Sequence, residues 1–228
     1  MKLFKFFLIA VLLAGNQGYV FAAKDDAVSG GMDLGGDAIF DDKALIDGYT
    51  EKFSGESKDI LLAMVGDDSL GAYKMAAAVR VFTKKYASET LKAEKSIVIK
   101  IFLRRLNRSD SAFVQVEIMH ALVVLDRYQY FQSMVPALIL KMDHYNRVVS
   151  AMAYEGLDDV LKASDRPREA RIVFNVLRKT FFLSRKRLGK VQKPNEQLQH
   201  KLDILRWAIK ILGTQELKNL PQEVIGLL

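Results

Sequence analysis

Cysteine is absent from this chain of 228 residues. Without thiols the protein can form no disulfide, has no cysteine nucleophile, and offers no attachment point for a lipid of the bacterial lipoprotein kind. Side-chain packing alone therefore has to hold the fold together. Hydrophobic residues make up 50% of the chain, and a protein of this length can bury a sizeable core with them.

Histidine is scarce, and the motifs of common catalytic sites are missing. His120, His144 and His200 each lack a second histidine one helical turn away, so the usual spacing of metal ligands does not occur. There is no glycine-rich phosphate loop and no Gly-x-Ser-x-Gly elbow. Adjacent carboxylates such as Asp158 and Asp159 diverge on a helix and do not face one bond. We therefore predict no catalytic residue, no metal and no cofactor.

A hydrophobic run long enough to cross a membrane is also missing. The apolar run at residues 6–14 follows two lysines and precedes the small residues Ala22 and Ala23, as in a secretory signal. We predict a signal peptide over residues 1–22 and a mature protein that is periplasmic or secreted. An uncleaved anchor is the alternative, but the run falls far short of the roughly 20 residues that a spanning helix needs.

Residues 23–42 have few apolar side chains and are rich in glycine and aspartate. Because such a segment buries too little surface to offset its chain entropy, we predict a disordered acidic tether. A calcium loop is the alternative, but the EF-hand spacing and its closing glutamate are both missing. Residues 43–228 then form the folded domain.

Charge is distributed unevenly along the chain. The whole sequence holds 34 basic and 27 acidic residues, and residues 43–228 account for 31 and 21 of them. A basic body behind an acidic tail points to an anionic partner, or to the tail folding back on its own body.

Beyond residue 42, apolar residues recur every three to four positions, as in Val114, Ile118, Ala121 and Leu122. No stretch alternates as a strand does. The expected helices span roughly residues 43–53, 56–65, 69–86, 91–107, 111–126, 128–142, 146–163, 166–188, 196–212 and 215–227. The breaks between them are short and polar, which makes neighbouring helices antiparallel.

Proline occurs at only four positions, and three of them bear on helix ends. Pro167 follows Ser164 and Asp165, the order of a cap and a first-turn proline. Pro221 is expected to begin a last short helix. Pro136 should lie in the first turn of its helix or else kink it.

The helices form pairs that repeat along the chain. First helices begin near residues 56, 91, 128 and 166, at intervals of about 35 to 38 residues. In each second helix a small residue precedes an aliphatic one: Ala78-Val79, Ala121-Leu122, Gly156-Leu157 and Ala208-Ile209. We expect the small residues to let the two helices of a pair approach closely. A single pair cannot cover its own apolar face, so the pairs should stack.

The best-formed pair spans Met134 to Leu157. It resembles the HEAT-repeat family through Val135-Pro136-Ala137-Leu138, Asp143, Val149, Ala153 and Gly156-Leu157. The family often has an arginine where this chain has Gln115 and Ser150, and its usual period is longer. The resemblance covers about residues 56–213. It implies an all-α superhelix, a HEAT-like solenoid of about four antiparallel helix pairs, which acts as a binding scaffold without chemistry of its own.

Basic residues dominate the stretch from Arg166 to Lys193, where ten of them accompany a single acid, Glu169. Their spacing is ordered, because arginines recur every seven residues and so lie along one side of a helix. The other side carries Val173, Leu177, Phe181 and Leu188, which we expect to face the core. We predict an anion-binding face made of Arg168, Arg171, Arg178, Lys179, Arg185 and Lys186. An ordinary solvated helix face is the alternative.

Partner chemistry follows from the compartment and from this face. Export argues against nucleic acid, and we expect no base-stacking aromatic residue interleaved with the basic ones. A protein partner, an anionic envelope polymer, lipid headgroups or the protein's own acidic tail fit better. Tyr145 and Tyr154 are expected to pack between helix pairs, although exposed tyrosines could also anchor a partner.

The expected function is an exported, non-enzymatic scaffold or adaptor that binds a protein or an anionic envelope component. A secreted enzyme or maturation factor acting on cell-envelope substrates is the alternative. It would be favoured by a polar pocket that holds His120 or His200 beside a carboxylate. A self-assembling structural component is a third hypothesis.

Overall fold

The computed structural model describes residues 43–125, 131–162 and 164–228, and within these ranges the fold is all-helical, without a strand. The helices are α3 (Lys43–Phe53), α4 (Lys58–Gly66), α5 (Ala72–Tyr86), α6 (Lys92–Arg108), α7 (Ala112–Leu125), α8 (Phe131–Lys141), α9 (Arg147–Lys162), α10 (Pro167–Leu188), α11 (Glu196–Leu212), the 3-10 helix η1 (Thr214–Asn219) and α12 (Gln222–Ile225). The predicted signal peptide and acidic tether lie outside the described residues.

The helices predicted between residues 43 and 212 are confirmed, with small shifts at their ends. The single helix predicted over 215–227 is wrong. The chain there forms η1, turns extended at Leu220, and begins the short α12 after Pro221. Proline has no N–H to donate and disfavours the helical conformation in the residue before it, and Leu220 is extended here, so the helix does not continue through this point.

The other prolines confirm one prediction, correct one, and exclude one alternative of a third. Pro167 begins α10 as predicted, but the capping position is Arg166. Ser164 lies before the capping position. Its hydroxyl donates a hydrogen bond to the carboxylate of Glu169 and accepts one from the backbone N–H of Arg166 at 3.4 Å. Pro136 lies inside α8, beyond its first turn, so the first-turn alternative is wrong and a kink at this position stays a prediction.

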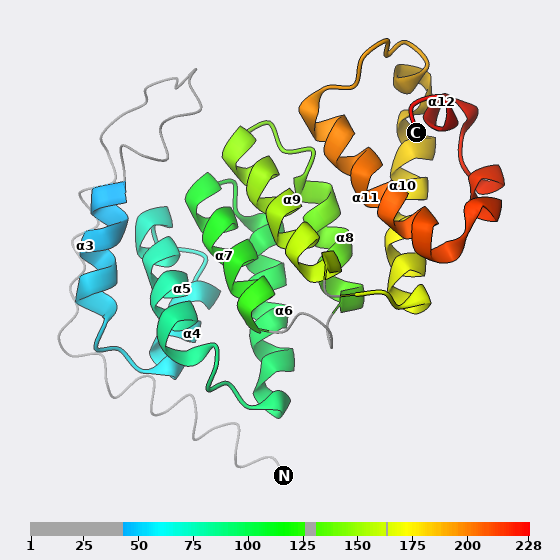
Figure 1. The fold of residues 1–228 in the computed structure, drawn as a ribbon. Coiled ribbons are helices and arrows are strands. Elements are labelled where there is room, and N and C mark those ends of the chain that lie inside the picture. Colours follow the sequence, from blue (N-terminus) through cyan, green and yellow to red (C-terminus); the bar gives the residue numbers. More distant parts are fainter. Residues whose placement is uncertain (1–42, 126–130, 163) are drawn as a thin grey trace, which may run out of the picture. The chain divides into compact units, whose positions relative to one another are not determined.

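The helices pack in two layers (Figure 1). In one layer α3, α5, α7 and α9 contact one another in chain order, and in the other layer α4, α6, α8 and α10 do the same. Across the layers, α4 packs on α5, α6 on α7, α8 on α9, and α10 on α11. The helix α11 contacts α9 less extensively than α9 contacts α7. The pairs predicted from the sequence therefore occur as pairs in space.

Aromatic and aliphatic side chains fill the space between the layers. Phe82 of α5 meets Phe102 of α6 edge to face, with ring centroids 5.4 Å apart, and both rings are fully buried. In α10 the side predicted to face the core is confirmed as buried: Val173, Leu177, Phe181 and Leu188. This burial is the main contribution to stability in a chain without disulfides.

Gly156 shows what the small residues do. A β-carbon added at Gly156 would lie 3.1 Å from the side chain of Val123, which belongs to α7. The close approach is therefore between the second helices of successive pairs, α7 and α9. We expected it between the two helices of one pair, and that expectation is wrong at this position, where the small residue sets the spacing along a layer.

Charged side chains connect one helix pair to the next. Arg80 of α5 donates to Asp47 of α3 at 2.7 Å and to Glu117 of α7 at 2.9 Å. Burial opposes the charge of Arg80, but its two acidic partners outweigh that effect and raise its pKa. Lys201 of α11 pairs with Asp143, which follows α8.

Candidate binding surfaces

The side of α10 opposite its buried residues carries the six predicted binding residues. They are exposed or, at Arg178, half-buried: Arg168, Arg171, Arg178, Lys179, Arg185 and Lys186. The helix is fixed to the rest of the fold by its packing against α8, α11 and α12. Because one side is held in the core, the basic residues have a defined direction and spacing along the helix.

Arg171 differs from the rest of this group. Its guanidinium forms an ion pair with Glu216 of η1 at 2.8 Å. This hydrogen bond lowers the pKa of Glu216, and a second one from Asn219 adds to the effect. Arg171 therefore serves the fold by holding the C-terminal segment to α10, and the expected row of three equivalent arginines is reduced to two.

The other five predicted residues have no partner among the residues that the structure describes. Within the described ranges, no hydrogen bond or ion pair involves the side chains of Arg168, Arg178, Lys179, Arg185 or Lys186. We name these five cations the α10 basic face. Like charges held this close repel one another, so an anionic partner would lower their electrostatic energy.

Two large apolar side chains lie among these cations. Phe182 is 43% exposed and Leu183 is 82% exposed. Phe182 stands one helical turn after Arg178 and one turn before Arg185, so an aromatic ring is interleaved with the basic residues. The expectation that no aromatic residue is interleaved with the basic residues is therefore wrong. In the run Phe181-Phe182-Leu183 only Phe181 turns into the core.

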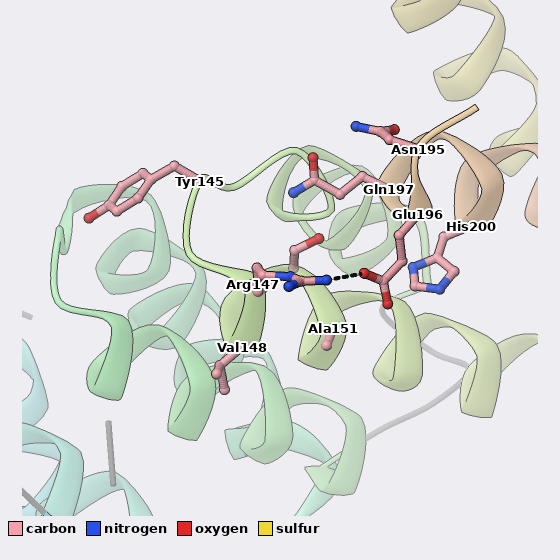
Figure 2. Close-up of a pocket in the computed structure, with 9 residues that line it drawn as sticks. Tyr145, Arg147, Val148, Ala151, Asn195, Glu196, Gln197 and His200 are labelled. Carbon is pink, nitrogen blue, oxygen red and sulfur yellow. Dashed lines mark hydrogen bonds and ion pairs between the residues drawn. The ribbon is translucent and has the colours of Figure 1, made fainter. Parts of the chain in front are cut away.

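A second region surrounds the turn between α8 and α9. A hollow of 630 Å³ lies between the first turns of α9 and α11, and Figure 2 shows its lining. Arg147 of α9 pairs with Glu196 of α11 across it at 3.0 Å, and this contact lowers the pKa of Glu196. His200 lies beside Glu196 and stacks flat on Tyr154, with ring centroids 3.8 Å apart.

Two further hollows adjoin the first. One of 610 Å³ lies between α10 and α11 and shares Asn195 and Gln197 with it. The other, of 510 Å³, shares Tyr145. The prediction that the tyrosines pack between pairs is confirmed for Tyr154, which lies against His200, and wrong for Tyr145, which is 84% exposed. Tyr145 projects from the turn away from the Arg147–Glu196 pair (Figure 2).

Ser150 and His200 contribute a serine hydroxyl and an imidazole to the first hollow. Ser150 lines the first hollow, but its hydroxyl donates to the carbonyl of Met142 at 2.8 Å. His200 forms no hydrogen bond with any described residue. His120 is exposed on α7, far along the chain from the other two histidines. Among the residues that the structure describes, no group of three or more His, Cys, Asp or Glu could hold a metal ion.

His144 occupies the centre of the turn between α8 and α9. Its Nδ1 accepts a hydrogen bond from the backbone N–H of Asn146 at 3.1 Å, and its carbonyl accepts one from Gln197 at 2.8 Å. Burial lowers the pKa of His144, and the positive charge of Lys141 lowers it further. The fold therefore favours the neutral imidazole.

Acidification is expected to weaken the fold through His144. The unfolded chain takes up this proton near pH 6.5 and the folded chain only at a lower pH, so the free energy of unfolding should fall as the pH drops below about 6.5. Carboxylates with a lowered pKa, such as Glu94 and Glu196, reduce the free energy of unfolding only when the pH falls below about 5. Urea unfolding between about pH 7 and pH 5 should show a smaller loss in His144→Gln than in the wild type. An equal loss in both proteins would contradict the assignment.

Comparisons of the chain with protein families, with functionally characterised proteins and with solved structures each found no match. In the described ranges, none of the helices has both the length and the apolar composition that a membrane crossing requires. The structure itself defines an all-helical fold of packed helix pairs, with a basic and partly apolar face on α10.

Proposed function

We propose that the protein is an exported, non-enzymatic scaffold or adaptor, and that it binds an anionic partner through the α10 basic face. We further propose that its helices form a HEAT-like solenoid of about four antiparallel pairs. The alternation of helices between two layers supports the solenoid. The N-terminal apolar run after two lysines supports export.

The observation that carries the binding proposal is the lack of partners on the α10 basic face. Cations that join helix pairs elsewhere have acidic partners, as Arg80 has Asp47 and Lys201 has Asp143. Arg178 and Arg185 have none among the described residues. Arginine donates two parallel hydrogen bonds to a carboxylate or a phosphate, so a protein carboxylate, an envelope polymer or a lipid headgroup can fill this role.

Reversing the charge of Arg178 and Arg185 together tests the proposal. We expect Arg178→Glu/Arg185→Glu to lower recovery of the partner at least about tenfold when intact producing cells are crosslinked and the copurifying material is identified. Thermal stability should stay nearly unchanged, because neither side chain is buried and neither has a hydrogen-bond or ion-pair partner among the described residues. Arg171 is left intact because its ion pair with Glu216 belongs to the fold.

The matched control is Lys84→Glu/Lys100→Glu, which changes the net charge equally at exposed positions of α5 and α6. This variant should recover the partner as the wild type does. Equal recovery by the α10 variant, or equal loss in both, would contradict a site on α10.

A secreted enzyme or maturation factor is the second candidate, because His200 and Glu196 line the same hollow. Two contacts weigh against it: Glu196 is paired with Arg147, and His200 is stacked on Tyr154. The substitution His200→Phe keeps an aromatic ring against Tyr154 and removes both imidazole nitrogens. Loss of cellular function in this variant, with partner recovery intact, would establish the enzymatic alternative.

A further inference from the structure

We infer that the α10 basic face docks on the surface of an anionic lipid bilayer, with Phe182 and Leu183 entering the headgroup region. This inference rests on the proposed function, because it names the anionic partner that α10 takes. The face has two properties that one partner must satisfy together: cations that have no partner among the described residues, and exposed apolar side chains.

The arrangement on the helix places one exposed apolar residue between two rows of cations and the other beside them. Residues seven apart point in nearly the same direction on a helix, so Arg178 and Arg185 form one row and Lys179 and Lys186 form another. At 100° per residue, Phe182 projects between the two rows. Leu183 projects beside the lysine row and is the more exposed of the two apolar residues.

A bilayer surface covers all of these groups at once. Lipid phosphates accept hydrogen bonds from the arginines and lysines, while the headgroup and acyl boundary receives apolar side chains to a depth of roughly 5–10 Å. An acidic protein segment would pair with the cations but would gain little from covering Leu183, which is 82% exposed. Basic residues flanking Phe and Leu are the composition of helices that lie in the membrane interface.

The buried side of α10 limits how deeply the helix can enter. Phe174, Leu177 and Phe181 are packed in the protein core, so α10 cannot turn its main apolar side to the lipid without unfolding. Docking is therefore shallow and reversible. Each Lys or Arg near an anionic surface strengthens binding roughly fivefold, so the five cations of the face supply most of the affinity.

Vesicle sedimentation tests this inference with the exported protein purified from the cells that produce it. The protein should sediment with vesicles of equal parts phosphatidylglycerol and phosphatidylcholine, and not with phosphatidylcholine alone. Raising the salt from about 50 to about 300 mM should weaken the binding at least tenfold. Arg178→Glu/Arg185→Glu should weaken it at least a hundredfold, because four unit charges change.

The apolar residues are tested separately. Phe182→Ser/Leu183→Ser should weaken vesicle binding about tenfold or more with the charge unchanged, whereas Leu140→Ser/Ile97→Ser, at exposed positions of α8 and α6, should not. Circular dichroism shows whether each variant is folded. As an independent readout, Leu183→Trp combined with Trp207→Phe, which removes the one native tryptophan, should show a blue shift with the anionic vesicles only.

The outcomes separate this inference from the proposed function. If the protein ignores anionic vesicles but its partner in cells is lost with Arg178→Glu/Arg185→Glu, the partner is an acidic protein or polymer and the lipid inference falls. If Phe182→Ser/Leu183→Ser binds vesicles like the wild type, lipid docking through α10 is overturned. If Arg178→Glu/Arg185→Glu binds anionic vesicles and recovers the cellular partner as the wild type does, both proposals fall.

Discussion

Replacing Phe102 by alanine is expected to lower the free energy of unfolding by about 3 to 5 kcal/mol. Phe102 is fully buried in α6 and meets Phe82 of α5 edge to face. The substitution removes a whole ring from the contact between the two layers and leaves a cavity. The helices around it are held by their other neighbours and cannot close it. The aromatic pair also loses its edge-to-face attraction.

Urea unfolding followed by circular dichroism measures this loss. The matched control is Phe182→Ala, which deletes the same ring from an exposed position of α10 and should change stability by less than about 1 kcal/mol. A loss of similar size in the two variants would contradict the burial of Phe102 against Phe82 between the two layers. The same two variants distinguish an effect on stability from an effect on binding. Phe182→Ala should weaken vesicle binding, and Phe102→Ala should not as long as the protein is folded.

Replacing Arg105 by alanine is expected to cost about 2 to 3 kcal/mol. Its side chain is 9% exposed, and it reaches from α6 to the end of α4. There Nε donates to the carbonyl of Val65 at 2.9 Å, and a second nitrogen pairs with Asp68 at 2.8 Å. The cation satisfies a carbonyl at a helix C-terminus, where the helix dipole favours positive charge. Alanine leaves that carbonyl without a donor.

Arg104 provides the control at the neighbouring position. Its side chain is 64% exposed and stands 4.0 Å from the same Asp68, so Arg104→Ala should cost less than about 1 kcal/mol. Thermal unfolding of the two variants side by side checks the difference. Equal stabilities would show that the bond from Arg105 to the α4 terminus does not hold the turn between α4 and α5.

Local sequence pattern was enough to predict the helices, because each has a continuous apolar side and a polar break at its ends. It was also enough for the two sides of α10, since Val173 and Phe181 recur with the helical period and are buried. The sequence pattern failed where a contact depends on residues that are distant in the chain. The partner of Arg171 is Glu216, which belongs to a segment that the sequence pattern merged into one helix.

The exposure of Phe182 and of Tyr145 was not predicted. Phe181 and Phe182 are adjacent and chemically identical, yet one is in the core and the other lies among the cations. Their directions depend on the rotation of α10 against its neighbours, which periodicity gives only to within a fraction of a turn. Tyr145 is exposed for a related reason, because it lies in a turn whose path depends on both α8 and α9.

Through the ion pair between Arg171 and Glu216, the C-terminal segment neutralises part of the positive charge of α10. While Glu216 is in place, it neutralises one arginine at the edge of the basic face. Any event that detaches this segment, such as cleavage after Gly213, would leave Arg171 without its acidic partner, as a sixth cation beside the five of the α10 basic face, and would increase attraction to anions. The far end of the polypeptide thus adjusts the electrostatic strength of a helix that precedes it.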